Sequence, residues 1–287
     1  MKKITSIIVA SILILVLTLS VSAKSVLTFK DWNVSFAPGE ETEFIIDACT
    51  STDENVVMPD SINGYRIIGI DNNAFSNNTT VKQLSLGSYI GSIGKYAFLS
   101  CNNLSEIKLN SALSEIGENA FANTTALNSI NLEDTGVTVI KSYTFLNSGI
   151  SDVVLPRVCT EVEDNAFAQC SQLSRLIIPE TVTAIGDNAF RDSDNLTIWC
   201  YKDSYAYNYA INHNINYKTL VMGDVNLDGK CNIRDVTYIQ LYRAELCPLK
   251  NYIAEHLANV NEDNEVNLRD ATTIQMFLVG LIEKLGK

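Results

Sequence analysis

The sequence has little of what catalysis or nucleic-acid binding usually needs. Its only two histidines, His213 and His256, stand alone without the spacing of metal ligands. It contains no Gly-x-Ser-x-Gly nucleophile motif. With 21 Lys and Arg against 33 Asp and Glu, the net charge is −12, which repels nucleic acid and anionic membrane surfaces. These shortages favour a binding protein over an enzyme and exclude nucleic acid as a partner.

The first 23 residues have the composition of a secretory signal peptide. Lys2 and Lys3 precede an apolar run over residues 4–21, and the small residues at 21–23 form a cleavage site. No cysteine follows the run, which argues against a lipoprotein anchor. The run is also long enough for an uncleaved membrane anchor, and that alternative stays open. We predict cleavage after residue 23, secretion, no membrane insertion afterwards and a net charge of −14, because two lysines are removed.

The middle of the chain repeats with a period near 23 residues. Phenylalanine recurs at spacings of 23, 23, 24, 22 and 23, at Phe75, Phe98, Phe121, Phe145, Phe167 and Phe190. Apolar residues precede each Phe by five and by eight positions, and a Leu-x-x-Leu-x-Leu strand pattern follows it. One such unit cannot bury its apolar face alone, but stacked units can. The pattern predicts a solenoid whose units contain two short strands and a brief helical turn around Ala-Phe.

The repeated phrase Ile-Gly-x-x-Ala-Phe, at 93–98, 116–121 and 185–190, resembles the BspA-like leucine-rich repeat of bacterial surface proteins. Pro156 and Pro179, at the ends of predicted strands, fit the same family. The resemblance implies an α/β leucine-rich-repeat solenoid of about six units.

We expect this domain to occupy residues 24–218. Residues 24–55 would form the amino-terminal cap, and residues 204–218, with a short helix over 204–212, the carboxyl-terminal cap. Solenoids need caps because open ends would stack on one another.

Four of the seven cysteines occupy positions that other copies fill with small or aliphatic residues. They are Cys101, Cys159, Cys170 and Cys231. Cys101 and Cys170 are three units apart, about 14 Å at one strand spacing per unit, which is too far for a disulfide. We predict buried free thiols, which in a secreted protein indicate an anaerobic setting. Cys49, Cys200 and Cys247 stay undecided.

The outward side chains of the Leu-patterned strands become apolar toward the carboxyl end of the solenoid. They are Val154, Ile177 and Trp199, here called the apolar strip. An exposed apolar strip with an aromatic residue indicates a partner site, so we predict that it binds a protein or a glycan. The equal alternative is that a loop or a terminal helix covers it.

A segment near the carboxyl end is written twice, with an offset of 35 residues. The copies are residues 224–235 and 259–270, here called the first and second loops. Oxygen-bearing side chains lie at positions 1, 3, 5, 9 and 12 of each loop, a spacing with which a 12-residue loop wraps Ca²⁺. Both loops end in Asp rather than the usual Glu, and no amphipathic helix precedes the first. The pattern predicts a loop followed by a helix, twice.

This arrangement resembles the type I dockerin, the module that attaches cellulosomal proteins to cohesins. The resemblance covers about Met222 to Ile282, within a predicted domain of residues 219–287. It implies a small all-α module of two F-hands, half EF-hands, that binds two Ca²⁺ ions. The first set of ligands would be Asp224, Asn226, Asp228, the Lys230 carbonyl, Asn232 and Asp235. The second set would be Asn259, Asn261, Asp263, the Glu265 carbonyl, Asn267 and Asp270.

The second loop departs from the family at two positions. Asn259 replaces the Asp of position 1, and Asn264 replaces the Gly of position 6. Asn tolerates the left-handed conformation better than most residues. With two ligand carboxylates against three, we expect the second site to bind Ca²⁺ more weakly.

The resemblance also implies which residues touch a cohesin. They are Ile233, Arg234, Gln240 and Leu241 in the first copy, and Leu268, Arg269, Gln275 and Met276 in the second. Because the two sets nearly coincide in chemistry, we expect either helix to bind one cohesin, in orientations about 180° apart. The Ser-Thr pair usual at positions 10 and 11 is absent, which leaves the cohesin type open. The alternative for Ile233 and Leu268 is a place in the core.

Together these patterns predict a secreted, non-catalytic component of a cellulosome or cell surface in an anaerobic bacterium, associated with polysaccharide breakdown. The dockerin would bind a cohesin of a scaffoldin, and the solenoid would bind an unknown protein or glycan. The alternative is a carbohydrate-active or proteolytic enzyme hidden in the repeats, since two carboxylates in a cleft leave no mark in a sequence.

Overall fold

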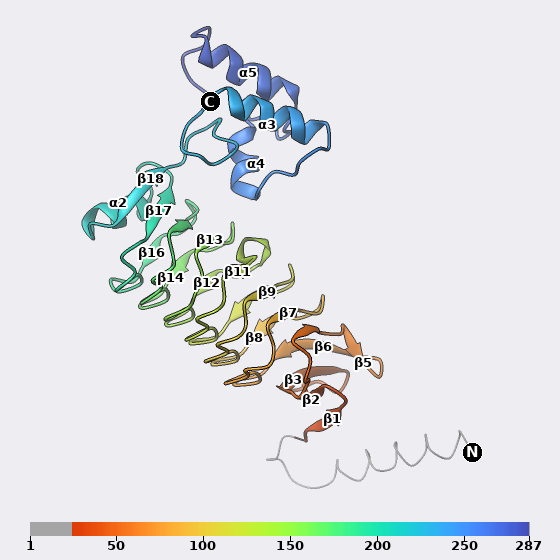
Figure 1. The fold of residues 1–287 in the computed structure, drawn as a ribbon. Coiled ribbons are helices and arrows are strands. Elements are labelled where there is room, and N and C mark those ends of the chain that lie inside the picture. Colours follow the sequence, from red (N-terminus) through yellow and green to blue (C-terminus); the bar gives the residue numbers. More distant parts are fainter. Residues whose placement is uncertain (1–24, 287) are drawn as a thin grey trace.

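The computed structural model describes residues 25–286, so the predicted signal peptide of residues 1–23 lies outside the described residues. The described chain forms an elongated solenoid, with a group of helices placed over one face near its carboxyl end (Figure 1). Within residues 25–286, no helix is both long and apolar enough to cross a bilayer.

An antiparallel ribbon closes the amino-terminal end of the solenoid. It consists of β1 (Leu27–Phe29), β2 (Trp32–Phe36) and β3 (Glu43–Cys49), and β3 pairs in parallel with β6 (Tyr65–Ile70). A short strand, β5 (Ser61–Ile62), pairs with the same β6. This ribbon lies within residues 24–55, the segment predicted as the amino-terminal cap.

Parallel two-residue strands line one side of the repeats. They are β8 (Ser92–Ile93), β10 (Glu115–Ile116), β12 (Val139–Ile140), β14 (Glu161–Val162) and β16 (Ala184–Ile185). Each of these strands ends in the aliphatic residue that lies five positions before one of the six recurring phenylalanines, here called the column phenylalanines.

The Leu-patterned strands form the opposite side, here called the ladder sheet. Its first half contains β4 (Asn55–Val57), β7 (Gln83–Ser85), β9 (Glu106–Lys108) and β11 (Ser129–Ile130). Its second half contains β13 (Asp152–Val154), β15 (Arg175–Ile177), β17 (Thr197–Cys200) and β18 (Asn216–Thr219). The 3-10 turn η1 (Leu132–Asp134) separates the halves, in the repeat whose Phe spacing is 24 rather than 23.

The column phenylalanines stack through the centre of the solenoid. Successive ring centroids from Phe75 to Phe190 are 4.7, 5.1, 5.4, 5.2 and 5.9 Å apart, and all six rings are buried. Trp32 of the amino-terminal cap lies 6.2 Å from the Phe75 ring, and Tyr209 lies 5.8 Å from the Phe190 ring. Each cap therefore covers one end of the stack with an aromatic ring.

The carboxyl-terminal cap contains α2 (Tyr205–Asn212), as predicted over 204–212. The Ser204 hydroxyl accepts a hydrogen bond from the Tyr207 N–H, so it satisfies a donor of the first turn. Tyr209 supplies both the covering ring and a hydroxyl that donates to the Gly186 carbonyl at 2.9 Å.

The predicted helical turn around Ala-Phe is wrong, and with it the α part of the α/β repeat. The chain makes a non-helical turn with left-handed residues two positions before and two after the Phe, such as Asn119 (φ 57°) and Asn123 (φ 59°). A left-handed residue interrupts a right-handed helix, and Asn accepts that conformation more readily than most residues.

All seven cysteines lie in the described residues and are unpaired, as predicted for four of them. The Cys101 and Cys170 thiols donate to the carbonyls of Phe75 and Phe145, each at 3.0 Å. Burial raises the pKa of both thiols to about 12. Cys231 is only half-buried, in the carboxyl-terminal helical group.

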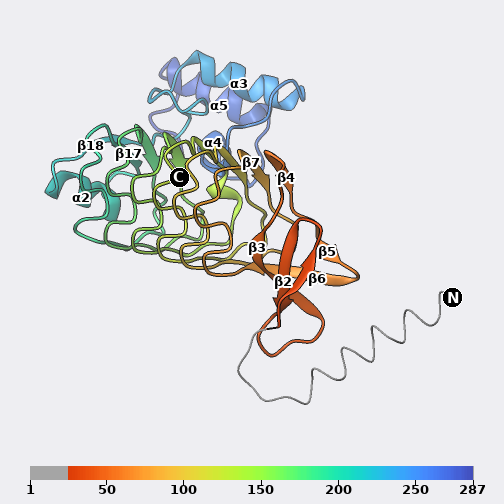
Figure 2. The ribbon, with the colours of Figure 1, turned by 60° about the horizontal axis from the view of Figure 1, so that its bottom comes forward.

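The carboxyl-terminal helices form a small unit with its own core, here called the C-module. They are α3 (Ile233–Arg243), α4 (Tyr252–Ala258) and α5 (Leu268–Leu278). The core contains Val225, Val236, Ile239, Ala258, Val260, Ala271 and Ile274. The helices after the two loops are as predicted, within a few residues, whereas α4 was not predicted. Figure 2 shows the C-module above the side of the solenoid on which the ladder sheet lies.

Candidate functional site

The two loops of the C-module follow the same backbone path. Position 4 is left-handed in both, as Leu227 (φ 57°) and Glu262 (φ 56°). Position 6 is left-handed as well, as Gly229 (φ 88°) and Asn264 (φ 68°). Asn264 therefore does what the usual Gly does, and the departure of the second loop at position 6 leaves its path unchanged.

The position 12 carboxylate closes each loop onto the start of its helix. Asp235 accepts from the Val225 and Asn226 N–H groups at 2.8 and 3.1 Å, and its other oxygen accepts from Asn232 N–H at 2.8 Å. Asp270 repeats the closure, accepting from the N–H groups at positions 3 and 9 at 3.3 and 2.9 Å. In both copies the position 9 Asn caps the following helix in a capping box.

Position 1 distinguishes the loops. The two oxygens of Asp224 accept from the N–H groups of Asp228 and Gly229 at 3.0 and 2.8 Å. Asn259 has a single amide oxygen, which accepts from Asp263 N–H at 3.2 Å. At position 1, the first loop thus has one more hydrogen bond and one more predicted ligand carboxylate than the second.

The donor set of each loop suits a hard cation. Within residues 25–286, no cluster of three or more His, Cys or acidic side chains is placed to hold a metal, and much of the predicted donor set is Asn side chains and carbonyls instead. Asp224, Asp235 and Asp270 are fully buried, and none of them makes an ion pair with a described residue. Burial raises the pKa of all three carboxyls. A buried carboxylate without a countercharge is costly, and a bound Ca²⁺ would offset that cost.

The other predicted ligands form one repeated chain of contacts. The position 3 Asn oxygens accept from the N–H groups of Asp228 and Asp263, at 2.8 and 3.0 Å. Those two aspartates accept from the N–H groups of Lys230 and Glu265, both at 3.0 Å. Each predicted ligand set therefore lies along a single tightly turned loop.

The predicted cohesin-contacting residues lie on the surface. Ile233 is 60% exposed, Leu268 57% and Met276 38%. Arg234, Gln240, Arg269 and Gln275 are also exposed, and Leu241 is half-buried. The alternative that Ile233 and Leu268 belong to the core is excluded.

The apolar strip is not exposed, so the predicted ligand face is wrong. Val154, Ile177 and Trp199 are 6%, 0% and 5% exposed. They lie in register on β13, β15 and β17 and pack against residues of the C-module and of the segment that leads to it. The covering residues are Leu220, Leu227, Ile253, Ala254 and Leu257. α4 and the first loop cover the strip. A covering loop was part of the alternative considered from the sequence, whereas the covering helix α4 was not predicted.

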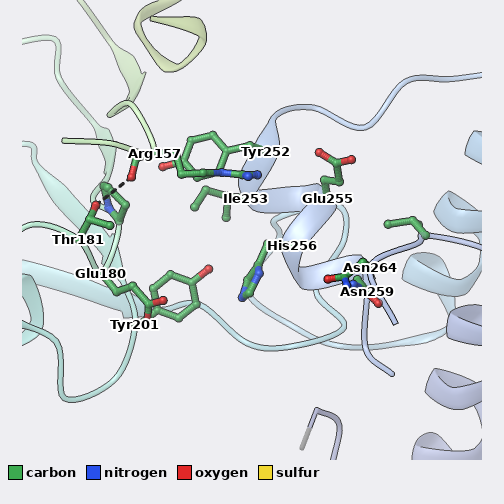
Figure 3. A pocket seen from close by; sticks show the side chains of 12 residues that line it. Arg157, Glu180, Thr181, Tyr201, Tyr252, Ile253, Glu255, His256, Asn259 and Asn264 are labelled. Carbon is green, nitrogen blue, oxygen red and sulfur yellow. Dashed lines mark hydrogen bonds between the residues drawn. The ribbon is translucent and has the colours of Figure 1, made fainter. Parts of the chain in front are cut away.

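Polar and aromatic contacts border this interface. The Tyr252 hydroxyl donates to the Leu155 carbonyl at 2.9 Å, and the Arg157 guanidinium lies 5.0 Å from the Tyr252 ring. Tyr201 and His256 meet edge to face at 5.9 Å beside a cavity of about 380 Å³ (Figure 3). Burial raises the Tyr201 pKa to about 12. The apolar spacing of Ile253, Ala254, Leu257 and Ala258 after Asn251 was the signal from which α4 could have been predicted.

Comparison with known proteins supports the repeat region. Residues 68–197 match the family described as BspA type leucine rich repeat region, in six copies. A leucine rich cell surface protein from Faecalibacterium prausnitzii is 22% identical, with a TM-score of 0.51, and the match covers 65% of this chain and 56% of that protein. The T. pallidum leucine rich repeat protein TpLRR is 24% identical, with a TM-score of 0.45, and the match covers 61% of this chain and 71% of that protein.

The pneumococcal vaccine antigen PcpA is 16% identical, with a TM-score of 0.40, over 63% of this chain and 51% of its own. No curated protein matches the chain significantly. The chain therefore carries a BspA-type leucine-rich repeat region, and the six predicted units are confirmed. At 22% identity and a TM-score of 0.51, the F. prausnitzii structure supports the fold alone.

Proposed function

We propose that this chain is a secreted, non-catalytic adaptor of an anaerobic bacterium. Its C-module is a type I dockerin that binds two Ca²⁺ ions and a cohesin of a scaffoldin, at the cell surface or in a cellulosome. Its solenoid carries a recognition surface for a protein or glycan, in the service of polysaccharide breakdown. The cell-surface description of the F. prausnitzii protein supports the location.

The observation that carries the proposal is the equivalence of the two loops. Both are left-handed at positions 4 and 6, both close through the position 12 carboxylate, and both lead into an 11-residue helix. The resemblance between the two loop sequences explains their shared ligand residues. It does not explain why two different residues, Gly229 and Asn264, have the same left-handed backbone conformation. The first loop has two buried carboxylates without an ion-pair partner, and the second loop has one. A cation bound in each loop would offset the cost of burying these charges.

The cohesin surface follows from exposure. Arg234 and Arg269, at position 11 of each copy, are exposed beside the exposed apolar side chains of Ile233 and Leu268. None of the eight predicted contact residues belongs to the apolar cluster shared with the solenoid. Both copies therefore stay available while the C-module covers the strip, which supports binding in either orientation.

A capture experiment tests the proposal. The purified protein is mixed with immobilised type I and type II cohesins, in excess calcium and in EGTA. We expect capture by at least one cohesin in calcium and none in EGTA. Lack of capture by every cohesin, or capture that EGTA leaves unchanged, would contradict the proposal, and turnover in a glycosidase or protease screen would contradict its non-catalytic part.

Substitution of the two arginines tests binding in either orientation. Arg234→Ala and Arg269→Ala should each leave cohesin capture nearly unchanged, and the double variant should lose it. Arg191→Ala, at an exposed arginine of the solenoid, is the matched control. One single variant that loses capture would exclude the second orientation.

The recognition surface of the solenoid must lie away from the covered strip. The first half of the ladder sheet is uncovered, and it exposes Val57 (77%), Gln83, Lys108 and Ser129 along successive strands. Because repeat proteins bind partners along such extended faces, we place the protein or glycan ligand there. Val57→Asp combined with Lys108→Glu should abolish binding to a ligand found by array screening, and unchanged binding would remove this assignment.

A further inference from the structure

The two loops have the same backbone path but differ at position 4 in the chemistry of the side chain. Leu227 of the first loop is 3% exposed and packs in the cluster that contains Trp199. Glu262 occupies the same position and backbone conformation in the second loop, where it is exposed. At position 4, only the first loop therefore has an apolar side chain, and that side chain belongs to the cluster shared with the solenoid.

Leu227 is in a backbone conformation that Leu rarely adopts. At φ 57° its Cβ crowds the following carbonyl oxygen, which is unfavourable for any residue other than Gly. Such a conformation persists only where the surroundings impose it, and because Glu262 shares it, the path of the loop itself imposes it. On the chain side, Asp224 accepts from the two N–H groups that follow Leu227. On the solenoid side, the apolar cluster with Trp199 encloses the Leu227 side chain.

Trp199 is the centre of the contact on the solenoid. The Lys218 ammonium lies 4.7 Å and the Arg175 guanidinium 5.7 Å from the centre of its ring. At position 6 of the first loop, a Cβ added to Gly229 would lie 3.7 Å from the Trp199 ring, so the loop backbone also lies against it. Loop closure and coverage of the strip thus share the same few residues.

The connection between the solenoid and the C-module is short. Leu220 N–H donates to the Cys200 carbonyl at 2.8 Å, which extends the pairing of β17 and β18, and its side chain joins the shared cluster. Gly223 is left-handed (φ 86°), and its N–H donates to the Leu257 carbonyl at the end of α4, at 2.8 Å. Residues 220–223 therefore keep the first loop beside β17 only while α4 holds its place.

We propose that the first loop is a calcium-dependent latch that holds the C-module on the apolar strip. This rests on the proposed calcium binding. Without the cation, the buried carboxylates of Asp224 and Asp235 are left in one small loop with no countercharge. The loop opens, Leu227 leaves its left-handed conformation, and Val154, Ile177 and Trp199 become exposed. The second loop contributes no such contact, because its position 4 is Glu262.

Fluorescence of Trp199 measures the latch. The chain has two tryptophans, and Trp32→Phe leaves Trp199 as the only one. In this background we compare acrylamide quenching of the parent protein, Leu227→Glu and Glu262→Leu, each in excess calcium and in EGTA. The two substitutions exchange the position 4 residues of the loops, so each is the matched control of the other.

We expect low quenching of the parent in calcium and a several-fold rise in EGTA. Leu227→Glu should show the high value already in calcium while calorimetry still detects two calcium ions, and Glu262→Leu should match the parent. Leu227→Ala replaces Leu227→Glu if the latter fails to bind calcium. Calcium binding without any change in Trp199 quenching would overturn the latch alone, whereas absence of calcium binding to the parent would overturn the proposed function.

Discussion

The solenoid and the C-module are held together by opposite means. The solenoid repeats one apolar contact many times, as in the stack of six phenylalanines, and buried hydroxyls such as those of Thr124 and Ser193 donate to backbone carbonyls. The C-module has a smaller apolar core and places three buried carboxylates in its loops. The first region should therefore be indifferent to metal, while the second should depend on it. The predictions below test that contrast.

The largest effect is expected from the centre of the stack. Phe121→Ala should lower the free energy of unfolding of the solenoid by about 3–5 kcal/mol, because a fully buried ring leaves a cavity. Urea unfolding followed by circular dichroism measures it, and Tyr96→Ala, at a partly exposed tyrosine, is the control. Calcium affinity should stay unchanged, and a parallel loss would show that the two regions are not independent.

Removal of a ligand carboxylate should act first on the C-module. Asp224→Ala takes away one of three carboxylates in the first loop and should weaken its calcium affinity by about a hundredfold. Titration calorimetry measures both sites, with Asp134→Ala on the solenoid as control. In calcium that saturates the variant, the unfolding of the repeats should not move. Equal calcium affinity in variant and parent would show that Asp224 is not a ligand.

Restoring the missing charge should strengthen the weaker site. Asn259→Asp gives the second loop the two position 1 oxygens and the charge that the first loop has, and should raise its calcium affinity about tenfold. Calorimetry of parent and variant gives the comparison directly. Two sites of equal affinity in the parent would contradict the expected order.

Replacement of Cys170 by serine should have little effect on the stability of the solenoid. Ser193 occupies the same column position as Cys170 and donates to the Phe167 carbonyl at 2.7 Å, as the Cys170 thiol donates to Phe145. Cys170→Ser should therefore change the free energy of unfolding by less than about 1 kcal/mol, as judged by urea unfolding. Cys170→Val, which loses the donor, should cost more, and the reverse order would show that the hydrogen bond does not matter.

The smallest expected effect is a change with alkaline pH in the stability difference between the parent and Cys170→Ser. Because the folded state raises the Cys170 pKa from 9.0 to about 12, its contribution to stability is complete below pH 9 and is lost as the pH rises toward 12. Any advantage of the parent over Cys170→Ser should shrink over that range. Thermal melting of both proteins between pH 8 and 10.5 measures it, and a widening gap would contradict the assignment.

The features that could be predicted from the sequence are those that recur in it at fixed spacing. Columns such as Phe98 and Phe121 and the loop ligands recur at fixed spacing, so their common environment could be inferred. The left-handed Asn119 and Asn123 also recur, and they were the overlooked signal against a helical turn. The burial of Trp199 could not be inferred, because an apolar strip has the same composition whether its partner is another protein or the same chain.

The seating of the C-module has a mechanical consequence. While calcium keeps the latch closed, residues 220–223 are too short and too well bonded to allow rotation of the C-module, and α4 packs against β13, β15 and β17. A partner that binds α3 or α5 would then fix the orientation of the whole solenoid relative to itself, which a flexible linker could not do. Its uncovered face would point in one direction, and little orientational freedom would be left to lose when that face meets its target.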